Sequence, residues 1–214
     1  MLRRLVSLCL AALLLVACGG GQATVQDTPA PEETRVLFIG NSYTFANDLP
    51  DLFAELARSG GHQAEVAMAA PGGWTLSRHA ESGETLSRLV EQAWHHVVLQ
   101  EQSVLPSQAE ERETQMYPAV RLLHGEIKTL GVEAILFMTW GRRGGLESEG
   151  FPDFAAMQAE LAAGYMEVAG ELGIRVAPVG ITWQKALEQD QELELWSGDG
   201  SHPSLQGSYL AACV

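Results

Sequence analysis

From Arg35 to the end of the chain, short apolar runs alternate with longer amphipathic segments. The short runs cover residues 35–40, 63–69, 95–100, 133–140 and 174–179, and they have the length and composition of buried strands. Segments with helical periodicity lie at 49–59, 83–93, 110–130, 152–173 and 181–188. This alternation predicts a parallel sheet that is covered on both faces by helices, with right-handed connections between the strands.

Glycines, amides and charged side chains follow the predicted strands. Ser42 comes after the first strand, Gly72 and Gly73 after the second, Gln102 after the third and Arg142 after the fourth; Asp199 and His202 follow the last strand and its helix. Ligands of open parallel sheets bind beyond the carboxyl ends of the strands. We therefore expect these residues to face one crevice.

The residue types at these strand ends are those that acyl transfer requires. A serine hydroxyl becomes a good nucleophile when a histidine accepts its proton, and a carboxylate fixes the tautomer of that histidine. Ser42, His202 and Asp199 are the candidates. The backbone N–H groups of Ser42 and Gly73 and the side-chain amide of Gln102 are candidates for stabilising an oxyanion.

Each of these residues alone also has a purely structural explanation. Ser42 is a suitable helix cap, Gly72 and Gly73 suit a turn, and Asp199 and His202 could be a loop carboxylate and a cap. The amide of Gln102 could be an ordinary polar group at a strand end. Their arrival in order, each at the end of a predicted strand, favours the catalytic interpretation.

These residues and their order resemble the SGNH (GDSL-type) hydrolase superfamily. Ser42 matches the nucleophile of that superfamily, Gly73 its oxyanion glycine, and Asp199 with His202 its Asp-x-x-His block. The resemblance spans residues 35–214 and implies a flavodoxin-like three-layer α/β/α sandwich with a five-stranded parallel sheet. It also implies a serine hydrolase that needs neither a metal ion nor an organic cofactor.

The sequence departs from the superfamily pattern at three places. Asn41 stands where the common Gly-Asp-Ser has aspartate, and Gln102 and Ser103 stand where Gly-x-Asn-Asp has asparagine and aspartate. The chain stops at Val214, inside the expected closing helix, which we therefore expect to be truncated.

The predicted function is hydrolysis of an ester, with acyl or acetyl groups on a cell-envelope or environmental carbohydrate as the expected substrate. Trp74, Trp140 and Arg142 are candidates for contacting that substrate, although either tryptophan could lie in the core and Arg142 could lie in a solvated loop. Two alternatives stay open. One is an esterase of the lysophospholipase or lipase type, and the other is a non-catalytic lipoprotein that binds glycans with a degenerate hydrolase fold.

The N-terminus predicts export and a lipid anchor. Arg3 and Arg4 precede an apolar stretch from Leu5 to Val16, which is short for a membrane span, and small residues then precede Cys18. This pattern is typical of a bacterial lipoprotein signal, with residues 1–17 removed and Cys18 lipidated. Residues 18–34 would form a flexible tether, and the domain at 35–214 would lie in the cell envelope, outside the cytoplasm.

Charge and spacing argue against two other classes of site. The 214-residue chain has 27 acidic and 13 basic residues and a formal net charge of −14, so no basic face for nucleic acid is expected. His95 and His96 are adjacent on a predicted strand and point to opposite faces, so they cannot jointly bind one metal ion. Of the three cysteines, only Cys213 would remain beside the lipidated one, so no internal disulfide is expected.

Overall fold

The computed structural model describes residues 33–214. The predicted signal, Cys18 and nearly all of the tether lie outside the described residues, so these predictions are not tested by the structure. Within residues 33–214, no helix combines the length and the apolar character that crossing a membrane requires.

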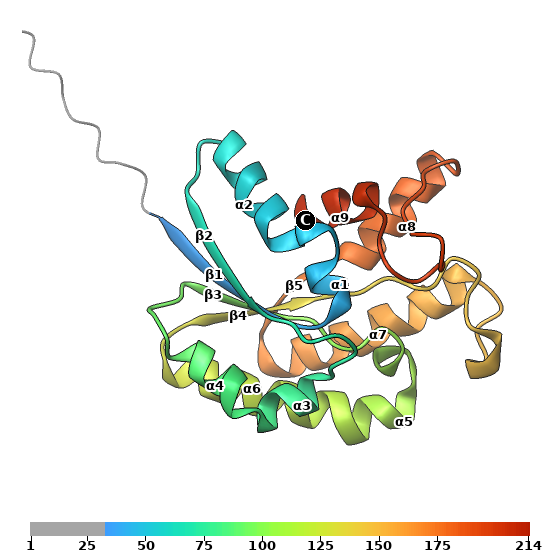
Figure 1. The fold of residues 1–214 in the computed structure, drawn as a ribbon. Coiled ribbons are helices and arrows are strands. Elements are labelled where there is room, and N and C mark those ends of the chain that lie inside the picture. The colour runs from blue at the N-terminus through green and yellow to red at the C-terminus, as the bar shows by residue number, and fades with distance from the viewer. Residues whose placement is uncertain (1–32) are drawn as a thin grey trace, which may run out of the picture. The chain divides into compact units, whose positions relative to one another are not determined.

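Five parallel strands form the central layer (Figure 1). They are β1 (Thr34–Ile39), β2 (Ala64–Ala69), β3 (His96–Leu99), β4 (Glu133–Phe137) and β5 (Arg175–Ala177). Their order across the sheet is β2-β1-β3-β4-β5, with every neighbouring pair parallel. The strand order reverses between β1 and β3, the position at which sheets of this kind bind ligands. The predicted fold class is confirmed.

Helices cover both faces of the sheet (Figure 1). On one face lie α2 (Leu49–Ser59), α8 (Val179–Gln189) and α9 (Leu205–Ala212); on the other lie α3 (Leu76–Glu81), α4 (Gly83–Leu89), α6 (Tyr117–Thr129) and α7 (Phe154–Leu172). The short helices α1 (Ser42–Phe45) and α5 (Ala109–Glu111) belong to connecting segments. Further short turns of helix span Ala46–Asp48, Leu105–Ser107, Arg112–Met116 and Glu147–Glu149.

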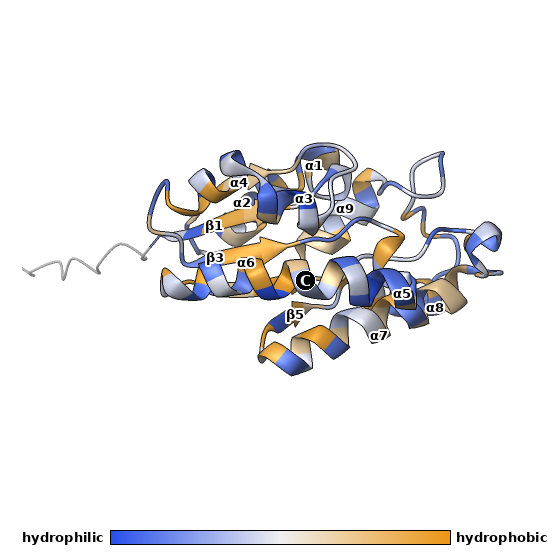
Figure 2. Cartoon of the chain, turned by 90° about the horizontal axis from the view of Figure 1, so that it is seen from below, coloured by the Kyte–Doolittle hydropathy of each residue, from blue (hydrophilic) through white to orange (hydrophobic). Residues whose placement is uncertain are grey.

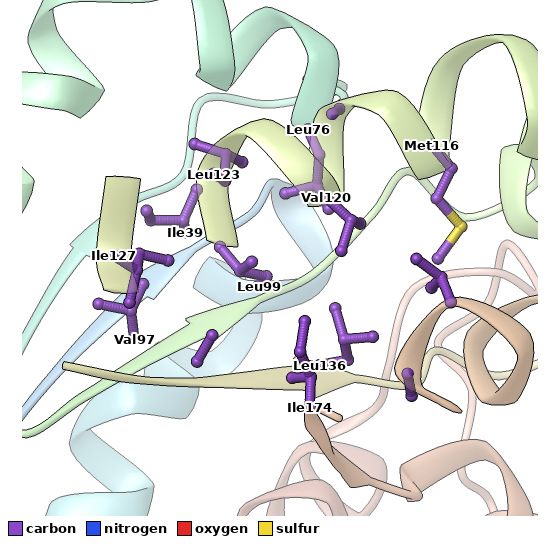
Figure 3. Packing of buried hydrophobic residues seen from close by; sticks show 14 of the residues in the cluster. Ile39, Leu76, Val97, Leu99, Met116, Val120, Leu123, Ile127, Leu136 and Ile174 are labelled. Carbon is purple, nitrogen blue, oxygen red and sulfur yellow. The ribbon is translucent and has the colours of Figure 1, made fainter. Parts of the chain in front are cut away.

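The alternation of side chains along β1 explains why both faces are covered. Leu37 and Ile39 are fully buried in a cluster with α3, α6 and α7, whereas Val36 and Phe38 are buried in the cluster beneath α2, α8 and α9. Figure 3 shows the first cluster, in which Ile39 lies close to apolar side chains of α6. In Figure 2 the strands are mostly orange and the helices carry blue residues, as a sheet buried on both faces requires.

Several predicted boundaries differ from those in the structure. The segment predicted at 83–93 ends earlier, at Leu89, and the preceding helix α3 was missed. Thr75 and Ser82 each cap a helix by accepting a bond from a backbone N–H, both at 3.3 Å, and Ser82 therefore separates α3 from α4. The strand predicted at 133–140 ends at Phe137.

The helix predicted at 110–130 is divided by a π-helical turn at Arg112–Met116. Pro118 follows this turn in the first turn of α6 and has no N–H to donate to the preceding turn. The apolar spacing in this segment predicts one buried helix face made of Met116, Val120, Leu123, Ile127 and Leu130. The first four are fully buried, whereas Leu130 follows the end of α6 and is exposed, so the prediction is wrong for Leu130.

Candidate active site

Ser42 begins helix α1, directly beyond the carboxyl end of β1. Its Oγ lies 2.9 Å from Nε2 of His202, a residue 160 positions later in the chain. Nδ1 of His202 lies 2.5 Å from Oδ2 of Asp199. The structure therefore brings the three predicted catalytic side chains into one continuous chain of hydrogen bonds.

Asp199 is held in its ionised form. Its pKa lies well below the usual range, first because of the hydrogen bond with His202 and further because Oδ1 accepts bonds from Ser197 Oγ and from the backbone N–H groups of Ser201 and His202. A carboxylate can only accept, so Nδ1 of His202 carries the proton of this pair. Nε2 is then the basic nitrogen, and it faces the hydroxyl of Ser42.

Contacts with the rest of the domain hold the loop of Asp199 and His202 in place. Trp140 Nε1 donates to the carbonyl of Ser201 at 3.0 Å, and the hydroxyls of Tyr43 and Ser201 lie 2.7 Å apart. Trp196 Nε1 donates to the carbonyl of Gly141 at 3.0 Å. The loop is thereby joined both to α1, which carries Ser42, and to the end of β4.

Asn41 and Gln100 fix the backbone turn that presents Ser42. Gln100 Oε1 accepts from the Asn41 N–H at 2.9 Å, and Gln100 Nε2 donates to Asn41 Oδ1 at 3.1 Å. Asn41 Oδ1 also caps α1 through the Tyr43 N–H, and Asn41 Nδ2 donates to the Trp74 carbonyl at 2.8 Å. Asn41 therefore connects the turn of Ser42 with the loop that contains Gly73.

The sequence did not reveal this role of Gln100. It was visible only as one amide among several at the end of β3, and its partner lies 59 positions earlier. Gly40 is needed for the same contact, since a Cβ there would lie 2.5 Å from Gln100 Oε1 and 2.3 Å from Thr44 Oγ1. The only sign of a tightly packed turn in the sequence is that Gly40 and Asn41 directly precede Ser42.

His79 supports the same turn and is not a ligand or a base in the site. It is fully buried, with Nε2 2.7 Å from the Gly40 carbonyl and Nδ1 2.8 Å from the Thr85 hydroxyl. Burial lowers the pKa of His79, so the ring is neutral. The carbonyl can only accept, and therefore Nε2 donates to Gly40.

The three predicted oxyanion donors lie around one cavity of about 210 Å³. It is lined by Asn41, Ser42, Tyr43, Gly73, Gln102, Ser103, Arg142, Ser201 and His202. Gly73 has a φ of +72°, a conformation that favours glycine. Within residues 33–214, the backbone N–H groups of Ser42 and Gly73 donate to no other group.

The amide of Gln102 has a defined orientation. Its Oε1 accepts from the N–H groups of Val104 and Leu105, at 2.7 and 3.0 Å. The NH2 group makes only a long contact, 3.4 Å, with Ser103 Oγ among the described residues. The carbonyl is thus occupied by the backbone, and the donor end remains available to the cavity.

The two tryptophans do not line this cavity. Trp140 is fully buried and stacked between Tyr43 and Trp183, at ring-centre distances of 4.6 and 4.2 Å. The candidate role of Trp140 in substrate binding is therefore corrected: it packs in the core and supports the loop of His202. Trp74 is half-buried beside the site, packed against His79 and Arg78.

The comparisons with known proteins are in keeping with this geometry. No protein-family model matches the chain, and a search of curated proteins also finds no match. Among solved structures, a candidate SGNH hydrolase from Slackia heliotrinireducens is 32% identical, with a TM-score of 0.73, over 85% of this chain and 96% of that one.

Two further solved structures share the fold at lower identity. A DUF4886 family protein from Bacteroides uniformis is 20% identical (TM-score 0.70; 85% of this chain and 81% of that one). An acetyl-xylooligosaccharide esterase from a Geobacillus species is 18% identical (TM-score 0.64; 84% and 91%). From the identity and coverage of the Slackia relative, together with the shared fold, we conclude that the chain belongs to the SGNH hydrolase family.

Proposed function

We propose that the protein is a serine esterase that removes small acyl groups, acetyl above all, from a carbohydrate. The observation that carries the proposal is the chain of hydrogen bonds from Ser42 through His202 to Asp199. In the proposed reaction, His202 Nε2 takes the proton of Ser42 as the oxygen attacks the ester carbonyl. His202 then gives the proton to the leaving alcohol, and water hydrolyses the acyl-enzyme by the same steps in reverse order.

The oxyanion of each tetrahedral intermediate would accept bonds from the Ser42 N–H, the Gly73 N–H and Gln102 Nε2. These donors come from three different connections, after β1, β2 and β3. Such donors contribute most when they are fixed before the reaction, because no reorganisation is then needed as charge develops. The hydrogen bonds of Asn41 and of Gln102 Oε1 provide this rigidity.

The lining of the cavity favours a small acyl group over a long one. All nine lining residues are polar, aromatic or glycine, and none is aliphatic. A long acyl chain would need apolar surface around it. The likeness to an acetyl-xylooligosaccharide esterase supports a carbohydrate as the carrier of the acyl group.

Turnover of p-nitrophenyl esters of increasing acyl length, with and without Ser42, tests the proposal. We expect the acetyl ester to be the best substrate. We also expect a fluorophosphonate to label the protein covalently and Ser42→Ala to lose nearly all turnover. The double variant Ser42→Ala/His202→Ala should be little worse, because the residues of a triad act as a unit. A folded Ser42→Ala protein with near-normal turnover would refute the triad.

The same series separates the alternatives. A preference for long acyl chains would favour the lysophospholipase or lipase type of esterase. Absence of both turnover and labelling, with binding to glycans, would favour a non-catalytic glycan-binding protein. Release of acetate from acetylated xylan fragments would directly support the carbohydrate substrate.

We also propose that Cys18 carries a lipid that holds the enzyme at a bacterial membrane, in the cell envelope. Support comes from the charged start, the apolar stretch and the small residues before Cys18. Full-length protein should partition into membranes, and Cys18→Ala should accumulate as unprocessed precursor. Normally processed, soluble Cys18→Ala protein would contradict the anchor.

A further inference from the structure

Arg142 lines the cavity that contains Ser42 and His202, and the side chains of residues 33–214 give its guanidinium group no hydrogen-bond partner. The residue follows β4 and is half-buried. Its Nε atom is buried, and within residues 33–214 it has no hydrogen-bond partner. A buried donor without an acceptor is costly, so an acceptor supplied by a ligand is a natural explanation.

No carboxylate within residues 33–214 forms an ion pair with Arg142. The neighbouring Arg143 differs in this respect, since its Nη2 lies 2.5 Å from Glu194 Oε2. Asp199, the acidic residue of the triad, already binds His202 with one oxygen and accepts three bonds with the other. Asp199 is therefore occupied with orienting the catalytic base.

Tyr43, the other acidic group beside Arg142, does not neutralise it either. Burial raises the pKa of the Tyr43 hydroxyl, which stays protonated and pairs with Ser201. The other residues that line the cavity are neutral, and His202 becomes positively charged only while it holds the proton of Ser42 during the reaction. No lining residue therefore compensates the positive charge of Arg142. This holds in a chain whose formal net charge is −14.

A guanidinium group with free donors binds oxyanions best. Its planar fork matches the two oxygens of a carboxylate or a phosphate. The overall negative charge of the protein repels anions, so affinity for an anion here would have to come from this local group. The inference deepens the proposed ester hydrolysis and rests on it.

We propose that Arg142 forms an anion subsite beside the nucleophile and that the natural substrate is an ester carrying a carboxylate or phosphate group close to the scissile carbonyl. Arg142 binds that group and positions the ester for attack by Ser42. On a carbohydrate substrate, an acidic sugar would supply this group.

Matched pairs of charged and neutral esters test the subsite on either side of the scissile bond. For the alcohol side the pair is para-acetoxybenzoate and para-acetoxybenzamide; for the acyl side it is ethyl hydrogen succinate and ethyl succinamate. The readout is the ratio of kcat/KM for the charged and the neutral member. We expect wild type to prefer the charged member of at least one pair by about 10-fold or more, as charge-assisted bidentate bonds give.

Variants at two adjacent arginines test whether the preference for the charged ester comes from Arg142. Arg142→Gln should lower the ratio of kcat/KM for the charged and the neutral ester to about 1, and Arg142→Lys should keep part of the preference, because the ammonium group retains the charge and loses the fork. Arg143→Gln is the control, since it removes the same charge one residue away and outside the cavity. Thermal unfolding of each variant confirms that it is folded.

Four outcomes overturn the proposal. Ser42-dependent turnover with no preference for the charged ester in either pair refutes the anion subsite. A preference that survives in Arg142→Gln refutes it as well. Both results leave the proposed ester hydrolysis intact. If no ester is hydrolysed, calorimetric binding of para-acetoxybenzoate to wild type and to Arg142→Gln decides the matter. Equal binding by both proteins, or binding by neither, then refutes the subsite.

Discussion

At the scale of single residues, Gln102 combines a structural contact with its proposed role as an oxyanion donor. Its carbonyl oxygen accepts from the backbone N–H groups of Val104 and Leu105, and the residue lines the cavity that also contains Ser42 and Gly73. Replacement by alanine would remove both functions together. Replacement by glutamate, which has nearly the same shape, keeps the oxygen that accepts hydrogen bonds and removes the NH2 group that donates them.

The first prediction concerns Gln102→Glu. The carboxylate still accepts from Val104 and Leu105, so the fold should be kept, but it has no proton to donate to an oxyanion. We expect kcat to fall by about 100- to 1,000-fold or more, because a single donor is worth this much and a negative charge now faces the developing oxyanion. KM should change little, since the bond forms mainly in the transition state.

Steady-state kinetics with the acetyl ester measures the effect. Gln189→Glu, the same change at the exposed end of α8, is the matched control and should leave kcat unaltered. Loss of one oxyanion donor lowers kcat by far more than about 3-fold. If Gln102→Glu retains more than about a third of wild-type kcat, the oxyanion hole consists of Ser42 and Gly73 alone.

At the scale of elements, the turn between β1 and α1 is held by side chains from two other parts of the fold. The end of β3 contributes Gln100, helix α3 contributes His79, and both contact the turn at Gly40 or Asn41. Backbone and side chains from three connections therefore meet where Ser42 is presented. Such a turn leaves no room for an added methyl group.

The second prediction is that Gly40→Ala impairs catalysis and stability together. The new Cβ would lie far inside van der Waals contact of Thr44 and Gln100, so the turn must shift and carry Ser42 with it. We expect a loss of about 1–3 kcal/mol in the free energy of unfolding, typical of overpacking, and a fall in kcat of at least about 10-fold.

Gly125→Ala is the matched control for this prediction. Gly125 lies in α6 and is exposed, and no atom of residues 33–214 comes within 4 Å of an added Cβ there. The change should raise stability by about 0.5–1 kcal/mol through helix propensity and leave kcat alone. Chemical unfolding and kinetics on both variants measure these effects; wild-type kcat in a folded Gly40→Ala protein would show that the turn tolerates displacement.

At the scale of the whole molecule, one buried carboxyl couples folding to pH. Glu101 is fully buried, and its Oε1 accepts from the N–H groups of Leu76 and Gln102, whereas Oε2 has no partner within residues 33–214. Burial raises the pKa of Glu101 from 4.5 to about 7, against the opposing effect of the two accepted bonds. The same carboxyl also joins the end of β3 to the start of α3.

The third prediction follows from this shift. Between pH 4.5 and about 7 the folded state binds the Glu101 proton and the unfolded state does not, so the free energy of unfolding falls as the pH rises through this window. The change from this one group is at most about 3 kcal/mol. Glu101→Gln cannot titrate and should lose this part of the pH dependence.

Chemical unfolding at a series of pH values tests this expectation. The quantity to compare is the slope of the free energy of unfolding against pH, because the new amide places an unpaired donor in the core and so lowers the absolute stability of Glu101→Gln. Glu126→Gln, an exposed change of the same kind on α6, should keep the wild-type slope. Identical slopes for Glu101→Gln and wild type would mean that the carboxyl titrates as an exposed one does.

The sequence by itself determined the class of fold, because the apolar periods of strands and helices and the glycines between them depend on near neighbours in the chain. It also identified Ser42, Gly73, Gln102, Asp199 and His202 as candidates, since their types and order are visible without a structure. Only the tertiary structure decided which amide holds the turn of Ser42, that Trp140 belongs to the core, and that Arg142 lies in the cavity without a counterion from the described part of the chain. These features depend on contacts between residues some 60 to 160 positions apart, and such contacts exist only after the strands are ordered and packed.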